Sequence, residues 1–172
     1  MNKDTKNWTW VLERACDECG FDASVVRRAD IGPRLVRAAS DLQTALARPS
    51  VAVRPSPDIW SPLEYACHVR DVYAIFLERL RRMLTEDAPT FANWDQDQTA
   101  IDERYAEQEP SVVAADLVRN AEVLASAFAG VTAWERTGLR SDGAQFTVLT
   151  LGQYLVHDPV HHVWDVTGVR QS

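Results

Sequence analysis

The stretch that decides the fold is residues 60–84, which read WSPLEYACHVRDVYAIFLERLRRML. Ser61 stands at an N-cap position, Pro62 at the first helical position and Glu64 at the third, which together make a capping box with a favoured proline. Apolar residues then recur at helical spacing and form one stripe, made of Tyr65, Val69, Val72, Phe76, Leu80 and Met83. The stretch therefore predicts a long amphipathic helix that ends before Pro89.

Three further helices are predicted on either side of this one, over about residues 30–47, 110–129 and 150–168. Thr150 and Gln153 are expected to form a capping box at the start of the last. No alternating strand pattern of useful length competes with these helices. Four amphipathic helices, two of them joined by a long connection, predict an all-α four-helix bundle.

The first 23 residues differ from the rest, because they are aromatic and contain Cys16 and Cys19. We predict that residues 1–23 are an N-terminal extension packed on a bundle domain of residues 24–172. A single CxxC is a weak zinc signal, since a strong one needs a second pair of ligands. Two thiols without a role are the simplest interpretation, and a redox disulfide or a partial metal knuckle stays open.

Composition excludes several classes of protein. A chain of 172 residues with 46% hydrophobic residues fits one globular domain. Its net charge of −7, with no cluster of Lys and Arg to offset it, argues against nucleic-acid binding. No signal peptide is visible, and no apolar run approaches the roughly 20 residues of a transmembrane helix. A cytoplasmic location without membrane association is the default expectation.

The histidines carry the predicted chemistry. His157 and His161 are four residues apart, so they share one face of the last helix, and Tyr154 on the same face predicts that it points inward. His68 lies about 75° from the centre of the apolar stripe on its own helix. His162 is rotated by about 100° from His161 and is the less favoured ligand. His68, His157 and His161 are thus predicted to hold one divalent metal with an open coordination position, as in catalytic zinc sites. A hydrogen-bonded histidine at the core edge remains the simpler alternative for each.

Pro159 falls between the two ligands predicted on the last helix. It removes a helical hydrogen bond, so the helix either kinks there or ends before Asp158 and starts again. The apolar face continues in phase on both sides, which favours a kink.

Three polar residues are predicted to orient the ligating histidines by hydrogen bonds to the ring nitrogen that does not bind the metal. Asp71 lies one turn beyond His68, and Asp165 lies one turn beyond His161. A carboxylate that accepts the far N–H of a ligating histidine fixes its tautomer. Tyr154 is a third candidate, and an exposed helix position is the alternative for both carboxylates.

Several motifs in this chain resemble those of the DinB family. Residues 60–64 and 66–71 resemble the second-helix motif of that family, and residues 157–162 with Asp165 resemble its last-helix motif. Residues 94–97 resemble a segment of actinobacterial members, as do residues 10–13 with Cys16 and residues 19–22. The similarity covers about residues 30–168.

This resemblance implies a four-helix bundle whose divalent metal is held by three histidines, or by two and a carboxylate. It assigns the ligands to His68, His157 and His161, with zinc or nickel favoured. The family includes mycothiol- and bacillithiol-dependent transferases and a maleylpyruvate isomerase. We therefore expect a metal-dependent S-transferase that joins a low-molecular-weight thiol such as mycothiol to a small-molecule substrate. A hydrolase with activated water and a non-enzymatic metal-binding stress-response module remain alternatives, and a homodimer stays open.

Overall fold

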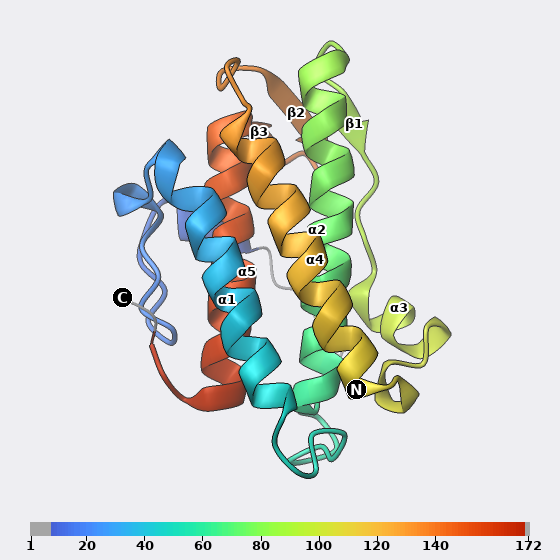
Figure 1. Ribbon diagram of the computed structural model, residues 1–172. Helices are drawn as coiled ribbons and strands as arrows, with labels where there is room; N and C mark the ends of the chain where they lie inside the picture. The colour runs from blue at the N-terminus through green and yellow to red at the C-terminus, as the bar shows by residue number, and fades with distance from the viewer. Residues whose placement is uncertain (1–7, 171–172) are drawn as a thin grey trace.

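The computed structural model describes residues 8–170, and five α-helices make up most of this part of the chain. They are α1 (Ile31–Leu46), α2 (Pro62–Thr85), α3 (Gln96–Asp102), α4 (Pro110–Ala129) and α5 (Val148–Thr167). The four long helices form a bundle in which α1 and α2 each pack against both α4 and α5 (Figure 1). The predicted four-helix bundle is confirmed. None of the helices among the described residues combines the length and apolar character that a membrane crossing requires.

The predicted cap of α2 is confirmed atom by atom. Oγ of Ser61 accepts a hydrogen bond from the backbone N of Glu64 at 3.2 Å, and the Glu64 carboxylate accepts one from the backbone N of Ser61 at 2.8 Å. The Glu64 side chain is only 3% exposed, and Arg54 neutralises its charge. This box fixes where α2 begins and therefore where His68 lies along it.

The last helix begins earlier than predicted and passes through its proline. Thr147 is the N-cap of α5, and its Oγ1 accepts a hydrogen bond from the backbone N of Thr150 at 3.1 Å. The predicted box of Thr150 with Gln153 is therefore wrong. Pro159 lies inside α5, which continues to Thr167, so the helix does not break there. Gly168 ends it with a φ of +70°, as predicted.

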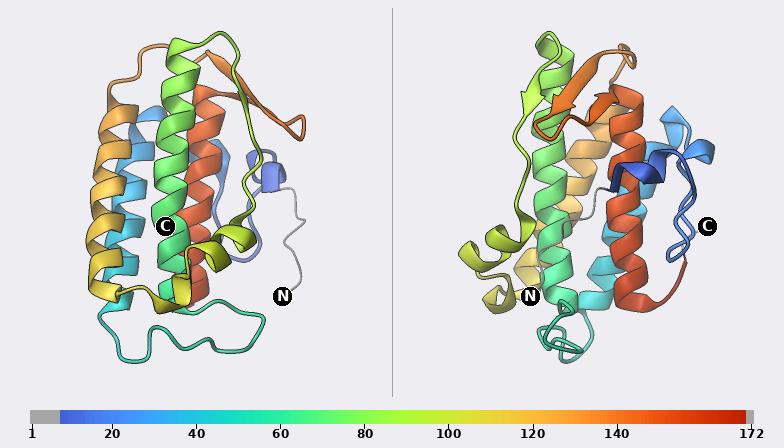
Figure 2. Two further views of the ribbon diagram at one scale, coloured as in Figure 1. Left: turned by 90° about the vertical axis from the view of Figure 1, so that its right-hand side faces the viewer. Right: turned by 180° about the vertical axis from the view of Figure 1, so that it is seen from behind.

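A small sheet that the sequence did not predict closes one end of the bundle. Its strands are β1 (Thr90–Phe91), β2 (Thr137–Arg140) and β3 (Gln145–Thr147), with β2 parallel to β1 and antiparallel to β3. Figure 2 shows it beside the end of α2 and the start of α5. Strands of two to four residues are too short for an alternating pattern to emerge, so the sequence does not reveal them.

Residues 8–30 form an N-terminal segment that lies across α5 on the side away from the bundle (Figure 2, right). It contains three short 3₁₀ helices at Trp8–Leu12, Ala23–Val25 and Arg28–Asp30. Nε2 of Gln153 on α5 donates to the backbone oxygens of Ala23 and Val26, at 3.1 and 3.0 Å. As a result α5 is buried on two sides. Residues 1–7 of the predicted extension lie outside the described part of the chain.

We expect Gly152 on α5 to tolerate no branched side chain. A Cβ at this position would lie 2.6 Å from Cδ1 of Ile31 and 3.1 Å from Cε1 of Phe128. Gly152→Val should lower the free energy of unfolding by about 1–3 kcal/mol, the usual cost of overpacking. Gly130→Ala is the control, because a Cβ there lies 3.7 Å from its nearest neighbour. Urea unfolding of both variants measures the difference, and equal stability would contradict the close packing of α5.

Candidate metal centre

Three side chains from two helices meet between α2 and α5. His68 comes from α2, while Asp158 and His162 are four residues apart on α5 and share one of its faces. Nε2 of His68 is 3.4 Å from Oδ2 of Asp158, and Nε2 of His162 is 3.9 Å from Oδ1 of the same carboxylate. One ligand atom from each of the three lies within 4.8 Å of the others. We name this group the His–Asp–His cluster.

Buried polar atoms in the His–Asp–His cluster lack hydrogen bonds. Within the described part of the chain, neither Nδ1 of His68 nor Oδ1 of Asp158 has a partner, and both atoms are buried. Burial alone would raise the pKa of Asp158, but the neighbouring imidazoles of His68 and His162 outweigh it and lower this pKa to about 2. The carboxylate is therefore ionised, and a cation would satisfy both its charge and its unpaired oxygen.

Asp165 fixes the orientation of His162. Nδ1 of His162 donates to Oδ2 of Asp165 at 2.8 Å, which directs Nε2 toward Asp158. A carboxylate in this position also makes the imidazole a more basic ligand. The sequence predicted this role for Asp165 toward His161, whose Nε2 lies farther away, at 3.9 Å.

Aromatic rings enclose the two histidines of the His–Asp–His cluster. The ring of Trp94 stacks on His68 with 5.2 Å between centroids and 8° between planes, and the ring of Trp60 lies 5.5 Å from the same imidazole. The ring of Tyr65 lies 4.9 Å from His162. These rings pack directly against both imidazoles. The segment around Trp94 that resembled the family thus contacts the cluster.

A cavity of about 390 Å³ borders Asp158 and His162. Its other lining residues are mostly acidic or aromatic, namely Glu18, Asp58, Asp97, Asp165, Trp8, Trp60, Tyr65 and Tyr154, with Gln96, His157 and His161. Several carboxylates around one cavity repel anions. The cavity therefore favours an uncharged or cationic ligand.

The other two predicted ligands, His157 and His161, meet Cys16 and Cys19 of the N-terminal segment. Sγ of Cys16 is 3.7 Å from Nδ1 of His161, and one ligand atom from each of the four residues lies within 4.8 Å of the rest. Burial lowers the pKa of His157 to about 4, and burial raises the pKa of the Cys19 thiol to about 12. We name this group the Cys–His cluster.

The structure does not bring His68, His157 and His161 to one place. Neighbouring residues on a helix are rotated by about 100°, so residues 157 and 161 lie on a different face of α5 from residues 158 and 162. The face with Asp158 and His162 meets α2, whereas the N-terminal segment covers the other face. Both faces of α5 are covered by other parts of the chain, so helix phase alone does not say which pair of residues faces α2.

The sequence did not lead us to Asp158 as a ligand, and it made His162 the less favoured ligand. The signal was available, because these two residues have the same four-residue spacing as His157 and His161. The family resemblance also implied that two histidines and a carboxylate can form the site. From the sequence alone, Asp158 marks only the point where a helix interrupted by Pro159 would start again.

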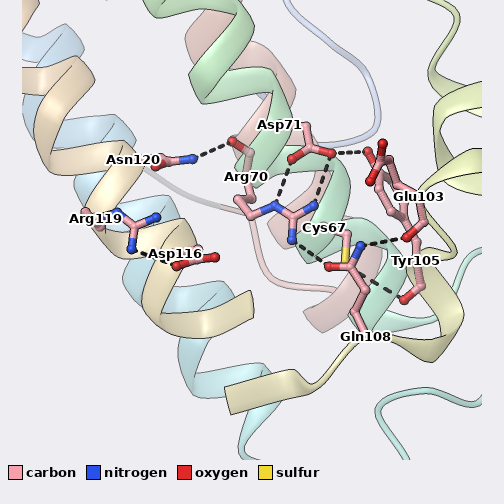
Figure 3. Close-up of polar contacts among 9 residues, drawn as sticks. All are labelled: Cys67, Arg70, Asp71, Glu103, Tyr105, Gln108, Asp116, Arg119 and Asn120. Carbon is pink, nitrogen blue, oxygen red and sulfur yellow. Dashed lines mark hydrogen bonds and ion pairs between the residues drawn. The ribbon is translucent and has the colours of Figure 1, made fainter. Parts of the chain in front are cut away.

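Asp71 does not support His68 as predicted. Its carboxylate accepts hydrogen bonds from Nε of Arg70 at 2.7 Å and from the hydroxyl of Tyr105 (Figure 3). Nη1 of Arg70 also donates to Oε1 of Gln108 at 2.6 Å. This network ties α2 to the segment between α3 and α4, so Asp71 holds that segment in place.

Tyr154 borders the cavity, but its hydroxyl is engaged away from the ligands. It accepts a hydrogen bond from Nη1 of Arg140 at 3.1 Å. Its ring centroid lies 5.3 Å from that of Phe146 and 6.2 Å from that of Phe76. Tyr154 therefore contributes to the wall of the cavity rather than to the orientation of a histidine.

Comparison with known proteins agrees with this fold. The profile of the DinB superfamily matches residues 34–166 and gives no subgroup such as an actinobacterial type. A similar solved structure is YfiT from Bacillus subtilis, described as a probable metal-dependent hydrolase with an unusual four-helix bundle topology. The TM-score is 0.74 at 18% identity, over 82% of this chain and 84% of that one, which shows a shared fold. No curated protein sequence matches the chain.

Proposed function

Since the chain belongs to the DinB superfamily, we propose that it is a metal-dependent enzyme whose divalent ion is held by His68, Asp158 and His162. The observation that carries this proposal is the buried oxygen Oδ1 of Asp158, which has no hydrogen-bond partner among the described residues. It belongs to a carboxylate that faces Nε2 of His68 and borders a cavity. Two imidazoles and a carboxylate are a known donor set for catalytic zinc. Zinc or nickel is the proposed metal.

The separations in the His–Asp–His cluster suit such an ion. Bonds of 2.0–2.2 Å in tetrahedral geometry place two ligand atoms roughly 3.3–3.5 Å apart. The distance from Nε2 of His68 to Oδ2 of Asp158 is 3.4 Å. Small adjustments of His162, which Asp165 already orients, would complete the site. When bound, the ion supplies Lewis acidity, which lowers the pKa of a thiol or a water molecule in its open position.

The residues around the cavity determine which nucleophile this site accepts. The acidic lining disfavours an anionic thiol and suits an uncharged one such as mycothiol. Burial raises the pKa of Tyr65 to about 12, so its hydroxyl stays protonated and can donate a hydrogen bond to a substrate. We propose thiol S-transfer to an electrophilic small molecule. A carbon–sulfur bond forms, the leaving group departs with its electron pair, and the thiol proton passes to solvent.

Hydrolysis is the second candidate. A water molecule fits the same open position, and YfiT, which shares the fold, is described as a probable metal-dependent hydrolase. The two reactions differ in one measurable respect, because hydrolysis needs no thiol.

The test is turnover by the metal-loaded full chain with an aryl halide and mycothiol, with glutathione as an anionic thiol, and with aryl esters without thiol. We expect conjugation with mycothiol and slower conjugation with glutathione. His68→Ala should lower kcat/KM by about 100-fold or more, because a metal ion contributes several kcal/mol to transition-state stabilisation. The control is Cys67→Ala, which removes a buried thiol outside both clusters. Ester turnover without thiol would favour the hydrolase, and no turnover with any substrate would contradict both reactions and favour a binding module.

A further inference from the structure

The Cys–His cluster joins two parts of the chain that are far apart in sequence. Cys16 and Cys19 lie in a tight loop that is closed by backbone hydrogen bonds from Gly20 to Cys16 and from Cys16 to Phe21, both 2.8 Å long. Gly20 has a φ of +78°, a conformation that side chains disfavour. The loop brings both thiols to α5, where His157 and His161 complete the group.

We propose that Cys16, Cys19, His157 and His161 bind one structural zinc ion that fastens the N-terminal segment to α5. This proposal is independent of the reaction proposed above, because it uses none of the residues in the His–Asp–His cluster. The spacing of the ligands, C-x₂-C and H-x₃-H, is the one typical of structural zinc sites. Four protein ligands fill a tetrahedral ion and leave no open position, so the site would support the fold rather than react.

The distances in the Cys–His cluster fit tetrahedral zinc. Zinc–sulfur bonds of about 2.3 Å and zinc–nitrogen bonds of 2.0–2.1 Å separate the two ligand atoms by roughly 3.6 Å. Sγ of Cys16 lies 3.7 Å from Nδ1 of His161. Nε2 of His161 lies 3.5 Å from Oε2 of Glu18. A carboxylate at the far nitrogen of the ring orients an imidazole whose other nitrogen binds a metal.

Burial and charge give independent support. All four residues are buried, with exposed fractions of 2% for Cys16, 0% for Cys19, 4% for His157 and 8% for His161. Within the described residues, the buried atom Nε2 of His157 has no hydrogen-bond partner, and an ion in the cluster would supply one. Two thiolates, two neutral imidazoles and Zn²⁺ carry no net charge. The free-energy cost of removing this group from water is therefore small.

The two cysteines lie outside the part of the chain that matches the DinB superfamily, which begins at residue 34. Two of the four proposed ligands thus lie outside the matched region, and the other two, His157 and His161, lie within it. The zinc site adjoins the cavity, because Trp8 and Glu18 of the N-terminal segment are among the lining residues. Holding this segment against α5 would keep one wall of the cavity in place.

A disulfide between Cys16 and Cys19 is the main alternative. It would explain two cysteines in one loop, but it would give no role to His157 and His161 beside them. It would also leave Nε2 of His157 without a partner. A bound cation accounts for all four residues together.

The experiment replaces the bound metal of the full chain with Co²⁺ and records its absorption spectrum. Thiolate ligands give a sulfur-to-cobalt charge-transfer band, and the His–Asp–His cluster contains no sulfur, so the band reports on the Cys–His cluster alone. We expect the band in the wild-type chain and its loss in Cys16→Ser and His157→Ala. It should persist in Cys67→Ala, which removes the third cysteine, and in His68→Ala.

Thiol titration and intact mass test the same proposal without relying on a variant that folds. Two of the three thiols should become reactive toward a thiol reagent only when a chelator is added, whereas the buried Cys67 should stay protected in the folded chain. Elemental analysis should find zinc released as the two thiols become reactive. A chain that is lighter by two hydrogens, with an intact disulfide after anaerobic purification, would overturn the proposal. Free, reactive thiols with no cobalt band would overturn it equally.

Discussion

Replacing His162 with alanine is expected to remove the ion from the His–Asp–His cluster and to abolish turnover, whereas His157→Ala should leave that ion bound. Loss of a residue that merely orients a ligand already costs 10–100-fold in metal affinity, so loss of the ligand itself should cost about 100-fold or more. His162 is the ligand that Asp165 orients, at 2.8 Å. The two histidines lie on different faces of α5, so each variant is expected to affect a different cluster.

Elemental analysis and the Co²⁺ spectrum together measure this difference. Each variant should retain one ion per chain, where the wild-type chain has two. The remaining ion should show the thiolate band in His162→Ala and lack it in His157→Ala. If both variants lost the same ion, the division into two clusters would be contradicted, and the three histidines predicted from sequence would regain a common site.

The second large effect concerns stability. A ligand present at 1,000 times its Kd stabilises the folded state by about 4 kcal/mol, and each kcal/mol changes Tm by about 2–4 °C in a domain of this size. We therefore expect a chelator to lower Tm by about 8–16 °C through loss of the zinc ion from the Cys–His cluster. Because the N-terminal segment depends on this ion, trypsin should also cleave faster after the exposed Arg14.

The His162→Ala variant isolates this contribution, since it lacks the other ion. A chelator should still lower its Tm, while the triple variant with Cys16→Ser and Cys19→Ser should melt at a lower temperature and show no further change. Equal melting temperatures with and without chelator in His162→Ala would contradict a stabilising zinc ion.

The bundle could be predicted from the sequence because its signals are local. The capping box of Ser61 and Glu64 places the start of α2, and the apolar stripes place the four long helices within a few residues. The small sheet was missed, because β1 has two residues and pairs with β2, which lies far away in sequence. Pairing between short, distant strands leaves no periodic pattern.

The grouping of the ligands depends on which part of the chain covers each face of α5, and no local sequence pattern contains this information. Both faces of α5 look like core, one because α2 covers it and the other because the N-terminal segment does. Helix periodicity gives the angle between His161 and His162 correctly, but it does not say which of the two faces α2. The CxxC motif and the histidine pair are each a weak signal of a metal site when taken alone. Only the fold shows that their four side chains lie close together.

The most direct test of two metal sites is an anomalous difference map from crystals of the full chain grown with zinc. We predict two peaks, one about 2.0–2.2 Å from a ligand atom of each of His68, Asp158 and His162, and one bonded to Cys16, Cys19, His157 and His161. A single peak shared by His68, His157 and His161 would contradict this account.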